Sequence, residues 1–236
     1  MVMQMMAAMM VIMIMMHVAD GADTNTVFSP CSDATVQKFD GFTFGLAFST
    51  RESFFFNQTQ LSPCDQRLSL SSQNAQVALF RSKVDEISLL TINSSTFNPI
   101  MSGAYMVAFA GQKYAARSLP ILVADTMHTI TSFTLVLEFQ RGTLQNLDWK
   151  NSGCDACSPD SVCLDNQNCA MPNSKCLGND GFSDCNLGIQ LAFSGTDKNL
   201  VALNSWYEVE NLRQYSLYGL FSNIHDSIIG QHDQPL

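Results

Sequence analysis

The chain has 236 residues, a formal net charge of −9 and a hydrophobic content of 46%. This length is sufficient for one domain with a sizeable core, because single β domains often reach ~200–250 residues. The acidic balance argues against nucleic acid as a partner, since an acidic surface repels phosphate backbones.

The first 22 residues are predicted to be a secretory signal and not part of the fold. Nine of the thirteen methionines lie in the first 16 positions. The apolar run over 5–16 is shorter than the ~20 residues of a membrane span, and small residues at 19–21 suit a cleavage point. Because Lys and Arg are missing from this stretch, an uncleaved anchor is the alternative. We expect residues 23–236 to form a single exported domain with no stable membrane insertion after cleavage.

Short strands are predicted along this domain, starting with 26–32. In the next strand, 41–49, large and small residues alternate with a period of two, which predicts a buried aromatic face. The large residues are Phe42, Phe44, Leu46 and Phe48. Further strands are predicted over 53–58, 75–81, 86–93, 104–110, 113–118 after a bulge at Gly111, 133–140, 143–150, 188–194 and 203–209. Helical spacing of apolar residues over 212–229 predicts a short helix.

Many short strands without a long intervening helix predict an all-β protein. We expect an antiparallel β-sandwich or jelly-roll-like domain with a disulfide-rich loop insert over 151–186 and a short C-terminal helix. Within 133–140, four alternating residues are assigned to the core, namely Phe133, Leu135, Leu137 and Phe139.

The eight cysteines are predicted to form structural disulfides, because an exported protein meets an oxidising compartment. Six belong to the insert: Cys154, Cys157, Cys163, Cys169, Cys176 and Cys185. The other two, Cys31 and Cys64, are most simply paired with each other, whereas the pairing inside the insert stays open. The insert has few apolar residues, so its bridges would replace the core that it lacks.

Zinc binding or redox cycling at Cys154 and Cys157 is the alternative for the insert. The cysteines have no second short-spaced pair and no nearby histidine, so we expect no metal and no cofactor. The insert is also acidic, and it carries the amides Asn166, Asn168, Asn173 and Asn179. A calcium loop over 179–184 is a further alternative, but a solvated acidic loop is preferred.

Several runs of residues resemble a family of secreted plant proteins labelled Expp. The resemblance is carried by GFTFGLAFS at 41–49, LSPCDQRLSLSS at 61–72, YMVAFAGQKYAARS at 105–118 and NSWYEVENLRQYSLYGL at 204–220. It extends from about residue 28 to residue 219. The resemblance implies an exported plant protein, and it implies neither an activity nor catalytic residues.

Catalytic sites are weakly indicated. The one histidine in the body of the domain, His128, is predicted to be a loop or strand-edge residue. Glycoside hydrolysis needs a pair of carboxyl groups, and each candidate occupies a position expected to face solvent. The candidates are Asp85, Glu86, Glu138, Glu208 and Glu210. We therefore predict no catalytic residue.

Ligand binding is the better-supported hypothesis, because tryptophan and tyrosine combine a flat apolar face with a polar group. The candidates are Trp149, Trp206, Tyr207 and Tyr105, with Tyr114 as a further residue of interest. Of the neighbours Trp206 and Tyr207, one should be buried if both lie on a strand. Two sequons predict glycosylation at Asn57 and Asn93.

The leading functional hypothesis is a secreted, non-catalytic binding or structural protein of the plant cell wall or apoplast. Its expected partner is a cell-wall polysaccharide or an extracellular protein. The alternatives are a carboxylate-based glycoside hydrolase and a module that binds an extracellular protein partner.

Overall fold

The computed structural model describes residues 23–68, 70, 74–93, 97–112, 116–150, 153–154, 157, 161–164, 168–176 and 185–214. The predicted signal segment, Tyr114, the calcium loop over 179–184 and the predicted helix beyond residue 214 lie outside these residues. No helix within the described residues is long and apolar enough to cross a membrane.

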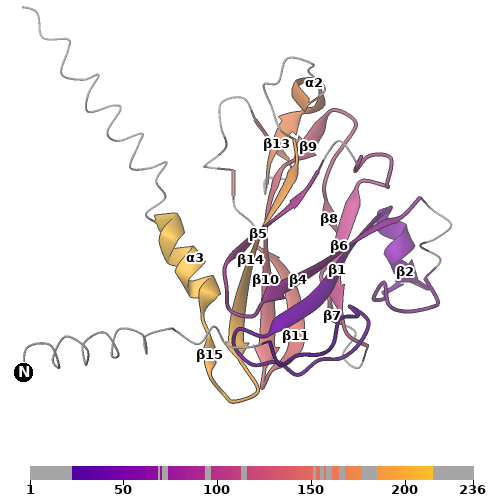
Figure 1. Cartoon of the computed structure of the whole chain (residues 1–236). Coiled ribbons are helices and arrows are strands. Elements are labelled where there is room, and N and C mark those ends of the chain that lie inside the picture. Colours follow the sequence, from indigo (N-terminus) through magenta and orange to yellow (C-terminus); the bar gives the residue numbers. More distant parts are fainter. Residues whose placement is uncertain are drawn as a thin grey trace, which may run out of the picture.

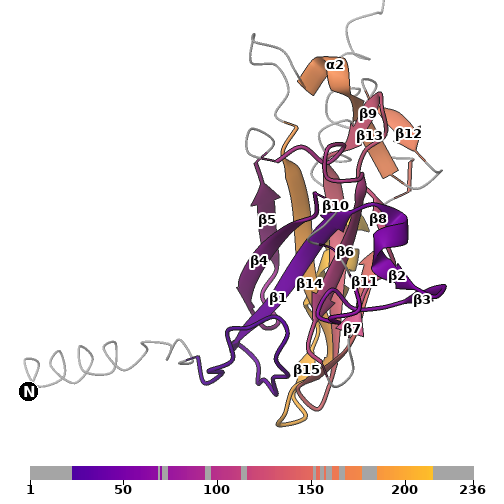
Figure 2. The same ribbon diagram turned by 90° about the vertical axis from the view of Figure 1, so that its right-hand side faces the viewer.

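Two five-stranded sheets form the body of the molecule (Figures 1 and 2). The first contains β4 (Gln76–Lys83), β1 (Gly41–Ser49), β6 (Tyr105–Ala110) and β7 (Ala116–Arg117) in that order, with β8 (Ile121–Leu122) also paired to β6. The second contains β11 (Thr143–Lys150), β10 (Ser132–Gln140), β14 (Leu187–Thr196) and β15 (Ala202–Leu203), with β5 (Ser88–Ile92) also paired to β14. The pairing is antiparallel except between β10 and β14, which run parallel.

Smaller elements are attached to these sheets. They are the 3-10 helix η1 (Arg51–Phe54), the hairpin of β2 (Phe55–Phe56) and β3 (Thr59–Gln60), the three-stranded sheet of β12 (Val162–Leu164), β13 (Asn168–Pro172) and β9 (His128–Ile130), and the helices α2 (Asn173–Cys176) and α3 (Ser205–Gln214). The three-stranded sheet and α2 lie at one end of the sandwich, and α3 packs against β14 (Figure 1).

The main core lies between the two five-stranded sheets, as the alternating pattern predicts. All four large residues of 41–49 and all four assigned residues of 133–140 belong to it. Along β14 the same alternation places Leu187, Ile189, Leu191 and Phe193 in the core. The prediction of an all-β sandwich with a disulfide-rich insert and a short helix near the C-terminus is confirmed.

A second, smaller core covers the outer face of the first sheet. It contains Ala47, Phe54, Val107 and Phe109, and the Cys31–Cys64 disulfide packs against it. Gly45 is directly opposite Phe109 in the pairing of β1 with β6. A Cβ atom at Gly45 would lie 2.3 Å from Cζ of the Phe109 ring, so this ring occupies the space that the missing side chain leaves.

Replacement of Gly45 by alanine is expected to lower the free energy of unfolding by about 1–3 kcal/mol, because Phe109 must leave its position. Gly188→Ala is the matched control. A Cβ at Gly188 would meet Thr131 O at 3.4 Å, at the edge of an ordinary contact. Urea denaturation of both variants measures the difference. Equal effects at the two glycines would mean that the Phe109 ring does not constrain β1.

Three of the predicted strands are wrong in detail. Residues 26–32 form no strand. The Arg81 guanidinium instead donates hydrogen bonds to the carbonyl oxygens of Asn25 and Val27, at 2.6 and 2.7 Å. Over 53–58 the chain forms the end of η1, the two-residue strand β2 and a turn. After Gly111, at φ +73°, the chain reverses into β7, which pairs antiparallel with β6, so the feature is a hairpin and not a bulge.

The predicted strand over 203–209 is also wrong, since α3 begins at Ser205. The Asp85 carboxylate accepts hydrogen bonds from the backbone N–H groups of Asn204 and Ser205, both at 2.8 Å. Helix N-termini leave such N–H groups without partners inside the helix. A carboxylate from the β4–β5 turn therefore accepts hydrogen bonds from the N–H groups at the start of α3.

The insert is stapled by three disulfides, Cys154–Cys163, Cys157–Cys169 and Cys176–Cys185. The predicted Cys31–Cys64 pair is confirmed. β13 of the insert pairs with β12 on one side and with β9 on the other. Because β9 leads directly into the sandwich strand β10, this pairing anchors the insert to the body of the protein.

Candidate functional site

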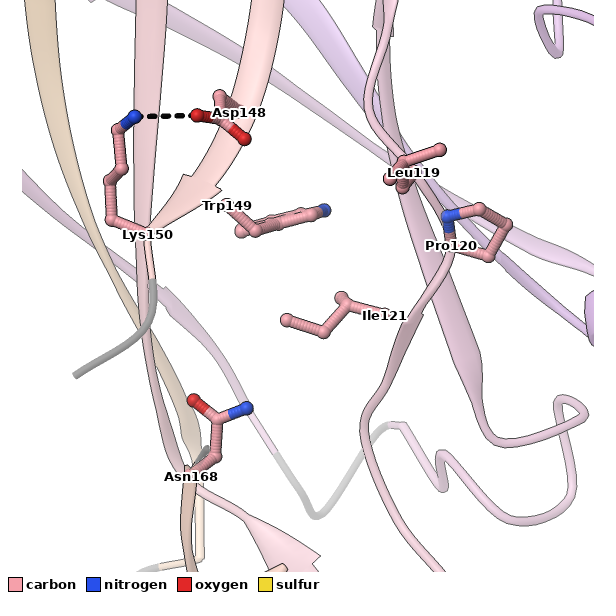
Figure 3. A pocket seen from close by; sticks show the side chains of 7 residues that line it. All are labelled: Leu119, Pro120, Ile121, Asp148, Trp149, Lys150 and Asn168. Atoms are coloured by element: carbon pink, nitrogen blue, oxygen red, sulfur yellow. Dashed lines mark hydrogen bonds and ion pairs between the residues drawn. The ribbon is translucent and has the colours of Figure 1, made fainter. Parts of the chain in front are cut away.

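Two adjoining cavities lie where the three-stranded sheet meets the sandwich. The first, of about 200 Å³, is lined by Leu119, Pro120, Ile121, Asp148, Trp149, Lys150 and Asn168 (Figure 3). The second, of about 300 Å³, is lined by Arg51, Tyr105, Pro120, Ile121, Leu122, Ile130, Leu164 and Asn168. The two cavities share Pro120, Ile121 and Asn168, so we treat them as one feature, called the groove.

Trp149 forms one wall of the groove at the end of β11. Its ring packs edge-on against Phe133, with the ring centroids 5.8 Å apart. The indole Nε1–H donates to Ser118 Oγ at 2.8 Å, and the same oxygen accepts the backbone N–H of Ala108 at 2.9 Å. The polar group of Trp149 is therefore engaged inside the protein, and the ring face is the part that a ligand can contact.

Asn168 lies at the start of β13 and borders both cavities. It is 6% exposed, and its amide points toward the space between Trp149 and Ile121 (Figure 3). Within the described part of the chain, its side-chain amide makes no hydrogen bond. Because Asn168 borders the open space of both cavities, we expect its amide to be available to a ligand that enters the groove.

The charged residues of the groove differ in whether they are paired. In the first cavity, Lys150 Nζ lies 2.5 Å from Asp148 Oδ2 (Figure 3). In the second, Arg51 is exposed at the first position of η1, and its guanidinium forms no ion pair or hydrogen bond among the described residues. Tyr105, half-buried on β6, completes this cavity.

The four predicted aromatic ligand residues are divided between two places. Trp149 and Tyr105 line the groove, one in each cavity, although they are 44 positions apart in the sequence. Trp206 and Tyr207 lie on α3. The Trp206 ring lies 5.8 Å from Lys150 Nζ, and Tyr207 is 65% exposed. We expected one of these two residues to be buried because neighbouring residues of a strand point to opposite faces. On a helix this argument does not apply.

The five candidate carboxylates do not line the groove. Asp85, predicted to face solvent, is instead buried beside Lys38 Nζ at 2.8 Å. The other four are exposed on a turn, on β10 and on α3. Among the described lining residues, Asp148 is the one carboxylate of the groove.

His128 lies at the start of β9, as the strand-edge prediction stated. Its Nδ1 is 3.3 Å from Asp125 Oδ1. Desolvation tends to raise the pKa of Asp125, but hydrogen bonds from the N–H groups of Met127 and His128 outweigh this effect and leave the pKa below its usual value. Asp125 thus remains an acceptor that holds the β8–β9 turn. No group of three or more metal-ligating side chains occurs among the residues that the structure describes.

The two predicted glycosylation residues are exposed. Asn57 lies at the turn between β2 and β3 with φ +47°, and Thr59 of its sequon is exposed as well. Asn93 follows β5, and the rest of its sequon lies outside the described residues. Occupancy of both sequons stays a prediction.

Sequence reasoning found part of the groove and missed part. It identified Trp149 and Tyr105 by residue type, and it named Asn168 only as one of four amides of the acidic insert. It missed Arg51. A lone arginine beside Glu52 carries no local signal, because its lack of a partner depends on which segments surround it in the fold.

The comparison with family models gives one match, to the family described as "Uncharacterised protein DDB_G0273449", over residues 1–129 and 124–228. No curated protein and no solved structure matches the chain. The resemblance to the plant Expp proteins stays a prediction. Because the family model matches well over half of the sequence, the chain belongs to the family described as "Uncharacterised protein DDB_G0273449".

Proposed function

We propose that this protein is a secreted, non-catalytic binding protein that holds an extracellular polysaccharide in the groove. We further propose that it acts in the plant cell wall or apoplast. Four disulfides among the described residues indicate an oxidising, extracellular compartment.

The unpartnered amide of Asn168 carries this proposal. Asn168 is 6% exposed in the wall of an open cavity, and its amide makes no hydrogen bond among the described residues. Sugars offer hydroxyl groups that can both donate to and accept from an amide. A groove that contains this amide together with the aromatic side chains of Trp149 and Tyr105 suits a sugar chain better than a purely apolar ligand.

The shape and charge of the groove support binding over hydrolysis. Glycoside hydrolases use two carboxyl groups that flank the scissile bond. The described lining of the groove contains only Asp148, which is paired with Lys150. The groove therefore favours binding of a sugar chain over its hydrolysis.

Replacement of Asn168 by leucine is expected to lower the affinity for a bound polysaccharide at least tenfold. A lost hydrogen bond that the ligand needs costs about 1–3 kcal/mol, and 1.4 kcal/mol is tenfold. The same change should alter the free energy of unfolding little, because the amide makes no hydrogen bond within the described part of the protein. A glycan array followed by calorimetry on the bound glycan measures the affinity, and urea denaturation measures the stability.

Asn146→Leu is the matched control, since Asn146 is exposed on β11 away from the groove lining. It should leave the affinity unchanged. If the unmodified protein binds no polysaccharide on the array, the sugar proposal fails. If Asn168→Leu destabilises the protein as strongly as a core substitution, the amide is structural and does not mark a binding site.

A further inference from the structure

We propose that the polysaccharide is anionic, and that the acidic group of one of its sugars pairs with Arg51. This inference rests on the proposed function and narrows its ligand class. The observation behind it is an arginine that borders a cavity and has no internal partner.

Several other cations of this acidic protein are paired with carboxylates. Arg81 Nη2 lies 2.6 Å from Asp23 Oδ2, and Lys38 Nζ lies 2.8 Å from Asp85 Oδ2. Arg67 donates two hydrogen bonds to Asp65, and this pairing lowers the pKa of Asp65 to about 2. Arg51 has no such carboxylate in the described part of the chain, so its charge is free to pair with a ligand.

The second cavity surrounds the Arg51 charge with uncharged residues. Arg51 is the one charged residue of its described lining, and Tyr105 and Asn168 supply polar groups beside it. The planar guanidinium binds carboxylate and similar oxyanions through two parallel hydrogen bonds. A uronic acid ring or a sulfated ring can therefore place its oxyanion on Arg51 and its hydroxyl groups near Asn168.

The two cavities together define the path that a bound polysaccharide would follow through the groove. Asn168 borders both, with Arg51 in one and Trp149 in the other. In the first cavity Lys150 is already paired with Asp148, so the net charge of that cavity is close to zero. An anionic ring in the Arg51 cavity followed by a ring against the Trp149 face matches this arrangement.

The test compares polygalacturonate with its fully methyl-esterified form, which keeps the sugar backbone and removes the charge. A sulfated galactan serves as a third probe. The full protein should bind at least one of the two charged polymers at least tenfold more tightly than the ester, as measured by calorimetry. The charged polymer that binds then identifies the oxyanion as carboxylate or sulfate.

Arg51→Gln should abolish this preference, so that the charged polymer binds no more tightly than the ester. Arg67→Gln removes the same charge outside the groove and should preserve the preference. Equal binding of charged and esterified polymers, or equal loss in both variants, would overturn the inference and leave the groove proposal standing. Absence of binding to every polysaccharide would instead refute the proposed function itself.

Discussion

Replacement of Asp85 by alanine is expected to lower the free energy of unfolding by about 2–4 kcal/mol, because each hydrogen-bond donor left without its acceptor costs about 1–3 kcal/mol and the Lys38 side chain, at 31% exposed, adds little as an unpaired charge. The side chain of Asp85 is 1% exposed, and its Oδ2 lies 2.8 Å from Lys38 Nζ. Its Oδ1 accepts the N–H groups of Asn204 and Ser205. Alanine would leave these two N–H groups without their acceptor and Lys38 without its counter-ion.

Urea denaturation followed by far-UV circular dichroism measures the effect and reports whether α3 persists. Asp85→Asn retains an oxygen for the two N–H groups and loses only the charge, so it should fall between the unmodified protein and Asp85→Ala. The neighbour Glu86 is exposed, and Glu86→Ala should change stability by less than about 0.5 kcal/mol. Similar values for Asp85→Ala and Glu86→Ala would show that the buried carboxylate does not hold the start of α3.

Loss of the Cys31–Cys64 disulfide, through the double substitution of both cysteines by serine, is expected to cost about 3–4 kcal/mol. The bridge closes a loop with a sequence separation of 33 residues, and the entropy of the unfolded chain rises with the length of the loop released. The bridge also packs against the small core of Phe54 and Phe109, which would lose part of its cover.

The double substitution of Cys154 and Cys163 is the matched comparison, with a sequence separation of 9 residues. Its expected cost is smaller, about 2–3 kcal/mol, because the loop released is shorter. Thermal unfolding of both double variants under oxidising conditions measures the order. A larger cost for Cys154 and Cys163 would mean that the insert contributes more to global stability than the segment over the first sheet.

The burial pattern of the strands could be predicted because it is local. Side chains alternate across a strand with a period of two, so Phe42 to Phe48 and Phe133 to Phe139 show their buried faces in the sequence itself. Glycine at position 45 belongs to the same pattern. That Phe109 fills the space above Gly45 required knowledge of the pairing between β1 and β6.

The parallel pairing of β10 with β14 could not be predicted in this way. β11 and the whole insert separate these strands in the sequence, and periodicity carries no information about the direction of a distant partner. The same limit explains the error over 203–209. The residues there are compatible with a strand, and Asp85, more than 100 positions away, supplies the contact that favours the helix.

The sequence by itself determined the β class, the faces that form the core and the disulfide-bonded character, because residue type and short-range spacing encode them. Only the tertiary structure decided the groove. Four separate segments contribute to it, through Trp149, Tyr105, Asn168 and Arg51. Their capacity to bind a ligand depends on which of their polar groups already have a hydrogen-bond or ion-pair partner in the fold. Whether Asn168 and Arg51 remain unpaired depends on neighbours that only the folded chain brings near, so no local pattern could have revealed it.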